Sequence, residues 1–118
     1  MKLTINRITL VEYDVIESDN NEYVYIDSDS NGTCQIGCCD YVHHRIFIHK
    51  KLSLAQKIKT LKHELTHAII EEYALSNDEG KLSEERVCDF MSIYGSEIES
   101  LTEHYFNKNS EKSPHTSK

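Results

Sequence analysis

Two histidines and a glutamate lie close together in the segment Lys62-His63-Glu64-Leu65-Thr66-His67-Ala68. The surrounding residues predict a helix, in which positions four apart leave the same face. His63 and His67 can therefore bind one zinc ion through their imidazoles. Glu64 projects from the edge of that face, where it can act as a base on water without itself binding the metal. The spacing thus favours metal-assisted hydrolysis.

A catalytic zinc needs a third protein ligand, because such sites usually combine three protein ligands with one open position for water. We predict that Glu85 is this ligand. Asp89 shares a helix face with Glu85 and can accept the spare N–H of a ligand histidine. Glu84 is a close rival of Glu85. Glu71 is a weaker rival, since it lies too far along the helix of the histidines to close a tetrahedron comfortably.

These residues resemble the gluzincin branch of zinc metallopeptidases. In its small size the chain is similar to the minigluzincins and to the ImmA/IrrE-like peptidases of phages and mobile elements, over about residues 52–98. The resemblance implies that His63, His67 and Glu85 bind one Zn2+ and that Glu64 is the base. It also implies a specific protein or peptide substrate, as in ImmA-like peptidases that cut a repressor. It leaves the identity of that substrate open.

Length and composition favour one globular domain without a membrane span. The chain has 118 residues, enough for a single core, and its apolar runs are too short to cross a bilayer. The N-terminus lacks the apolar core of a signal peptide, so we expect a cytoplasmic protein whose four cysteines are free thiols. A net charge of −7 argues against general nucleic-acid binding. The oligomeric state stays open.

The middle of the chain, residues 41–63, differs from the rest in charge. It has no acidic residue but six basic ones: Arg45, Lys50, Lys51, Lys57, Lys59 and Lys62. One interpretation is a solvated helix face and a loop. The other is a docking surface for an acidic partner or substrate.

The first half of the chain predicts strands. Alternating apolar residues predict one strand from Leu3 to Val11, extending to about Ile16, and shorter strands at 23–26, 33–40 and 45–49, with a turn at 41–44. Together they form an antiparallel sheet of three or four strands. Either 33–40 or 45–49 is expected to lie at the edge beside the helix of the histidines, where a peptide can be added as a further strand.

The second half predicts two helices. Ser53 caps the first, whose apolar stripe is Leu54, Ile58, Leu61, Leu65, Ala68 and Ile69; Ser83 caps the second, whose stripe is Val87, Phe90, Tyr94, Ile98, Leu101 and Tyr105. We expect Cys88 and Met91 in the core as well, and His43, His44 and His49 at the surface. The fold class is therefore α+β and zincin-like, with one domain over residues 1–106 and a disordered polar tail over 107–118.

Two functions remain from this reading. The first is a zinc-dependent endopeptidase with Glu64 as general base. The second is a non-catalytic binding or inhibitory protein of a phage or mobile element, built on the same scaffold. Replacement of Glu64 by alanine distinguishes them, because only an enzyme needs the base.

Overall fold

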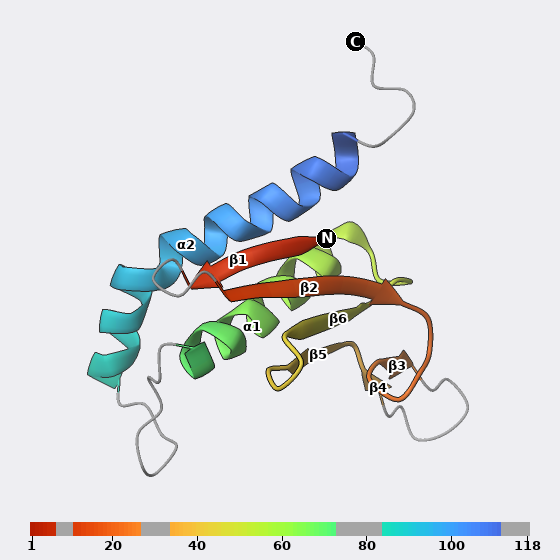
Figure 1. Cartoon of the computed structure of the whole chain (residues 1–118), viewed down its shortest axis with the longest axis horizontal. Coiled ribbons are helices and arrows are strands. Elements are labelled where there is room, and N and C mark those ends of the chain that lie inside the picture. Colours follow the sequence, from red (N-terminus) through yellow and green to blue (C-terminus); the bar gives the residue numbers. More distant parts are fainter. Residues whose placement is uncertain (7–10, 27–33, 73–83, 112–118) are drawn as a thin grey trace.

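The structure is a computed structural model that describes residues 1–6, 11–26, 34–72 and 84–111, without the side chains of residues 6, 84–86 and 109–111. A four-stranded sheet contains β1 (Lys2–Asn6), β2 (Val11–Ser18), β5 (Gly37–Asp40) and β6 (Arg45–His49), and a small sheet contains β3 (Tyr25–Ile26) and β4 (Cys34–Gln35). Helices α1 (Leu54–Glu72) and α2 (Glu84–Glu111) follow (Figure 1). The predicted α+β class, a small sheet followed by two helices, is confirmed. Neither described helix is long and apolar enough to cross a membrane.

The strand order of the main sheet is β1-β2-β6-β5. The β1–β2 and β5–β6 pairs are antiparallel, and the β2–β6 pair is parallel. β6 is therefore an inner strand, and β5 forms the edge. The sequence left two alternatives for the edge strand beside the helix of the histidines, 33–40 and 45–49. The structure confirms the first, because β5 lies within 33–40.

The prediction of a single first strand was wrong. Residues 3–16 contribute to two strands, β1 and β2, which pair with each other in register Leu3 to Tyr13. The alternation of apolar and polar residues runs through both strands because each strand buries every second side chain in the same core. These buried residues are Leu3 and Ile5 in β1 and Tyr13 and Val15 in β2. The predicted strand 33–40 also divides, since β4 and β5 belong to different sheets.

The turn predicted at 41–44 connects β5 to β6. His44 has a φ of 57°, which places it in the left-handed region. Asp40 fixes the turn: its carboxylate accepts hydrogen bonds from the His43 backbone N–H at 3.2 Å and from the Arg45 guanidinium at 2.7 Å. The Arg45 guanidinium beside it lowers the pKa of Asp40 to about 2. The turn thus stays anchored to the end of the edge strand.

Helix α1 crosses one face of the sheet, where it contacts β1, β5 and β6, and α2 packs against α1 and β1 (Figure 1). Ser53 caps α1 as predicted, because its hydroxyl accepts a hydrogen bond from the Gln56 N–H at 3.2 Å. The core includes Leu3, Ile5, Tyr13, Val15, Ile46, Ile48, Leu61, Leu65, Ala68, Ile69, Phe90, Ile98 and Tyr105. Burial of these side chains fixes the rotation of α1 about its axis.

Three elements of the fold, β2, α1 and α2, meet at the carboxylate of Glu17. Glu17 of β2 accepts a hydrogen bond from the Tyr105 hydroxyl of α2 at 2.6 Å and pairs with Lys57 of α1 at 2.8 Å. Burial by itself raises the pKa of Glu17, but the hydrogen bonds from Lys57 and Tyr105 outweigh it and hold the pKa below its ordinary value. This contact joins both helices to the sheet.

Several predicted core positions are exposed. Leu54, Val87, Cys88 and Met91 lie at the surface, because a helical period shows which face is apolar but not how far along the helix its partner extends. His49, which we expected at the surface, is buried and contacts Asn20 with its Nε2 at 2.6 Å.

Helix α2 continues to Glu111, into the stretch that we predicted to be a disordered tail. Ser83, the predicted cap of α2, and residues 112–118 lie outside the described residues.

Candidate metal centre and cleft

The two histidines of α1 have the separation of a shared metal pair. Four residues of helix place His63 and His67 one turn apart on the exposed side of α1, and their Nε2 atoms lie 3.2 Å from each other. Tetrahedral zinc with Zn–N bonds of 2.0–2.1 Å needs a nitrogen separation of about 3.3 Å. The distance between the two nitrogens therefore matches that of two ligands on one zinc ion.

Glu64 is held between the histidines and the edge strand. Its side chain is only 8% exposed, although its neighbours His63 and His67 face outward. Burial raises the pKa of Glu64, while the two imidazoles oppose that change. Among the described residues we find no ion pair that neutralises its carboxylate. A buried carboxylate with its basicity raised is suited to accept a proton.

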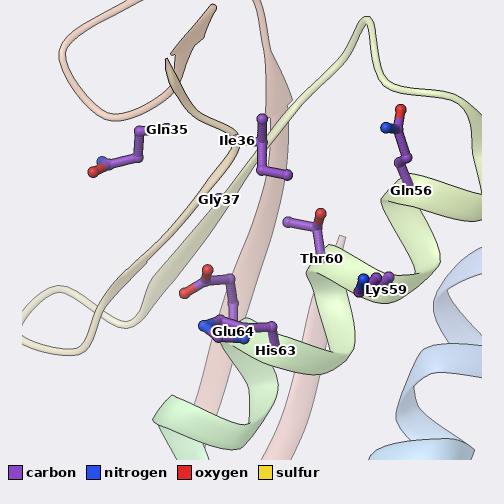
Figure 2. A pocket seen from close by; sticks show the side chains of 8 residues that line it. All are labelled: Gln35, Ile36, Gly37, Gln56, Lys59, Thr60, His63 and Glu64. Carbon is purple, nitrogen blue, oxygen red and sulfur yellow. The ribbon is translucent and has the colours of Figure 1, made fainter. Parts of the chain in front are cut away.

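Gly37 lets β5 approach α1 closely at this point. A Cβ atom on Gly37 would lie 2.5 Å from Cγ2 of Thr60 and 2.8 Å from Oε2 of Glu64. Figure 2 shows Thr60 and Glu64 reaching from α1 toward the glycine. The absence of a side chain at position 37 therefore sets the position of the Glu64 carboxylate. This role could not be predicted from sequence patterns, because the contact joins residues far apart in the chain.

Two cavities meet at Gly37, His63 and Glu64, and together they form a cleft between β5 and α1. The first, of about 410 Å³, is lined also by Gln35, Ile36, Gln56, Lys59 and Thr60 (Figure 2). The second, of about 480 Å³, is lined also by Cys39, Tyr41, His67, Ile70 and Glu71. Glu64 thus lies midway along a cleft that follows the edge of the sheet.

The cleft contains Tyr41, which the sequence did not single out. Gluzincins often use a tyrosine or histidine to stabilise the oxyanion, and Tyr94 and His104 are candidates by their closeness in sequence to Glu85. Neither lines either cavity: Tyr94 packs against the core and His104 is exposed. Burial, with the nearby Glu64 carboxylate, raises the pKa of Cys39 to about 12, so its thiol is protonated at neutral pH. Cys39 therefore lines the cleft with an uncharged side chain.

Residues predicted on α2 are placed only in part. Glu85 and its rival Glu84 lie in the first turn of α2, but their side chains lie outside the described structure. Asp89 is exposed one turn later. Among the described residues, no three His, Cys, Asp or Glu side chains form a group that could hold a metal, so Glu71 does not complete a site with the two histidines. The third ligand remains a prediction.

A helix with His-Glu-x-x-His beside an edge strand of a small sheet defines a zincin-like domain. The chain belongs to the peptidase family M78, described as the IrrE N-terminal-like domain, whose model matches residues 10–94. This match includes both histidines, Glu64, Glu85 and Asp89, and it confirms the resemblance to ImmA/IrrE-like proteins. No curated protein and no solved structure matches the chain. The chain therefore carries a peptidase-related domain.

Proposed function

We propose that this protein is a zinc-dependent endopeptidase. The observation that carries the proposal is the arrangement in the cleft: two imidazole nitrogens 3.2 Å apart lie beside a buried carboxylate at the free edge of a sheet. His63, His67 and Glu85 would hold the metal, and Asp89 would accept the remaining N–H of one histidine ring. Zn2+ bound there polarises the scissile carbonyl and lowers the pKa of the attacking water.

Glu64 carries the proton in this reaction. Its carboxylate accepts a proton from the water as the water oxygen bonds to the carbonyl carbon. It then delivers that proton to the amide nitrogen as the C–N bond breaks, so that the products are a carboxylic acid and an amine. Gly37 and Thr60 limit where the carboxylate can lie, and the burial of Glu64 keeps its basicity above that of an exposed glutamate.

The substrate binds as an extended strand along β5. That strand pairs with β6 on one side, and no described strand pairs with its other side, next to the cleft. Backbone groups on a free edge can pair with a peptide and hold its scissile bond beside Glu64. The substrate class is therefore an extended or locally unfolded segment of a protein.

The test compares cleavage of a mixed peptide library by the zinc-loaded wild type and by the Glu64→Gln variant. The amide has nearly the shape of the carboxylate but is not a base, so cleavage falls about 10²- to 10⁴-fold while zinc content stays the same. Zinc-loaded wild type that cleaves nothing, or a variant as active as the wild type, would contradict the proposal. A biological effect that survives Glu64→Gln would favour the binding-protein alternative.

A further inference from the structure

The two halves of the cleft carry opposite charges. Lys59 is the cationic side chain of the cavity on the N-terminal side of Glu64, and that cavity contains no carboxylate other than Glu64 itself. Glu71 lies in the cavity on the C-terminal side, which contains no lysine or arginine. A peptide in this cleft therefore meets positive charge at one end and negative charge at the other.

Within the part of the chain that the structure describes, neither Lys59 nor Glu71 has an ion-pair partner, unlike their neighbours on the same helix. The other two lysines of α1 are paired, Lys57 with Glu17 at 2.8 Å and Lys62 with Glu99 at 2.9 Å. Among the described residues, Lys59 has no such ion pair.

The acidic end shows the same contrast. Glu72 accepts a hydrogen bond from Tyr13 at 2.8 Å and lies 3.5 Å from His44. Glu71, next in the chain, has no ion pair or hydrogen bond within the described part. The helix thus pairs its charges with the fold outside the cleft and leaves them available inside it.

The spacing of the two charges fits an extended peptide. Twelve residues of helix separate Lys59 from Glu71, a rise of about 18 Å. An extended chain covers that length in about five residues at 3.3 Å each. Glu64 lies about 7.5 Å along the axis from Lys59 and about 10.5 Å from Glu71. One end of the cleft therefore lies about two peptide residues from the scissile bond and the other about three.

The direction of β5 orients the peptide. The residues at and before the start of β5, from Gln35 to Gly37, line the cavity of Lys59. Cys39 and Tyr41, which follow in the chain, line the cavity of Glu71. The strand therefore runs from the first cavity to the second. Antiparallel pairing is slightly more stable than parallel pairing, so the peptide runs the opposite way. Its N-terminal half then lies at Glu71 and its C-terminal half at Lys59.

We propose that the cleft selects segments with a basic residue about three positions before the cleaved bond and an acidic residue about two positions after it. This specificity rests on the proposed peptidase function and names its substrate class. It also gives the basic middle of the chain a local role, through Lys59 alone. Lys59 and Glu71 are exposed, so each charge pair with the peptide contributes a preference of up to about fivefold.

Binding can be measured without cleavage. Fluorescent peptides of identical composition carry the order Lys-x-x-x-Glu, the order Glu-x-x-x-Lys, or Gln at both positions. Their affinities are measured by polarisation on the full-length, zinc-loaded Glu64→Gln protein. We expect the Lys-first peptide to bind at least about fivefold more tightly than the Glu-first peptide. Lys59→Glu with Glu71→Lys in the same background should reverse that order.

Matched controls lie on the far side of the sheet. Lys2→Glu and Glu12→Lys make the same charge changes on β1 and β2, away from the cleft, and should leave the preference unchanged. Equal affinities for both orders, a Glu-first preference in the parent protein, or controls that act like the cleft variants would overturn the proposal. If the protein with Glu64 restored still prefers the Lys-first peptide but cleaves none of the peptides, the peptidase function is refuted and the charge selectivity stands.

Discussion

Replacement of Gly37 by alanine tests how the fold positions the base. The added methyl would lie 2.5 Å from Cγ2 of Thr60 and 2.8 Å from Oε2 of Glu64, whereas ordinary contact begins at 3.4 Å. Thr60 is buried and β-branched, so its rotamer in a helix resists change. The Glu64 carboxylate, at the end of a longer side chain, moves instead. The variant therefore perturbs stability through Thr60 and chemistry through Glu64.

The two effects have different sizes. Overpacking against Thr60 costs about 1–3 kcal/mol. The smaller conformational freedom of alanine in the unfolded chain offsets about 0.4–1 kcal/mol of this. We expect a net loss of about 1–2 kcal/mol in the free energy of unfolding, and a loss of about 10- to 100-fold in peptide cleavage from the displaced carboxylate.

A second substitution separates stability from activity. Thr60→Ser removes the methyl that meets the new Cβ, so in the Gly37→Ala background it should recover about 1 kcal/mol of unfolding free energy in urea titrations. It should not restore cleavage, because the contact with Glu64 remains. Gly95→Ala in α2 is the matched control: its nearest neighbour, Met91 Cε, lies at an ordinary 3.4 Å, so it should raise stability and leave cleavage unchanged. Full activity in Gly37→Ala would refute this account of how the base is positioned.

Other predictions concern the elements around the cleft. Ser53→Ala should lower the free energy of unfolding by about 1 kcal/mol in urea titrations, since it removes the cap of α1; an unchanged midpoint would contradict the capping role. Tyr105→Phe should cost about 1.5–3 kcal/mol, because it removes a hydrogen bond to a carboxylate. The folded pKa of Glu17 lies below its unfolded value, so its contribution is present above the ordinary carboxyl range and is lost as pH falls through the folded value. Thermal melts from pH 7 to pH 3 should therefore converge for wild type and Glu17→Gln, and parallel curves would contradict this.

Local patterns in the sequence were sufficient for the helices. The one-turn spacing of His63 and His67 and the cap at Ser53 depend only on neighbours within the helix, and the structure contains both features. The prediction that the whole apolar stripe is buried was wrong at Leu54 and Val87. Both are exposed, because burial depends on a partner surface and not on the helix alone.

Long-range pairing accounts for the features that the sequence did not reveal. The parallel β2–β6 pair joins distant segments, and it places β6 inside the sheet and β5 at its edge. The positions of Gly37 and Tyr41 in the cleft follow from that placement. Neither residue type is a signal for a cleft, since a glycine and a turn tyrosine are common where no site exists. The packing of β5 against α1 brings both residues into the cleft.

Metal content is the most direct test of the central claim. Full-length protein purified without added metal, then reconstituted with Zn2+ and desalted, is analysed by mass spectrometry together with His67→Ala, Glu85→Ala and the matched control Glu84→Ala. We predict about one zinc per chain in the wild type and in Glu84→Ala, and loss of zinc in the other two variants. Wild-type protein that retains no zinc would contradict the account, and zinc retained in Glu85→Ala would remove Glu85 from the site.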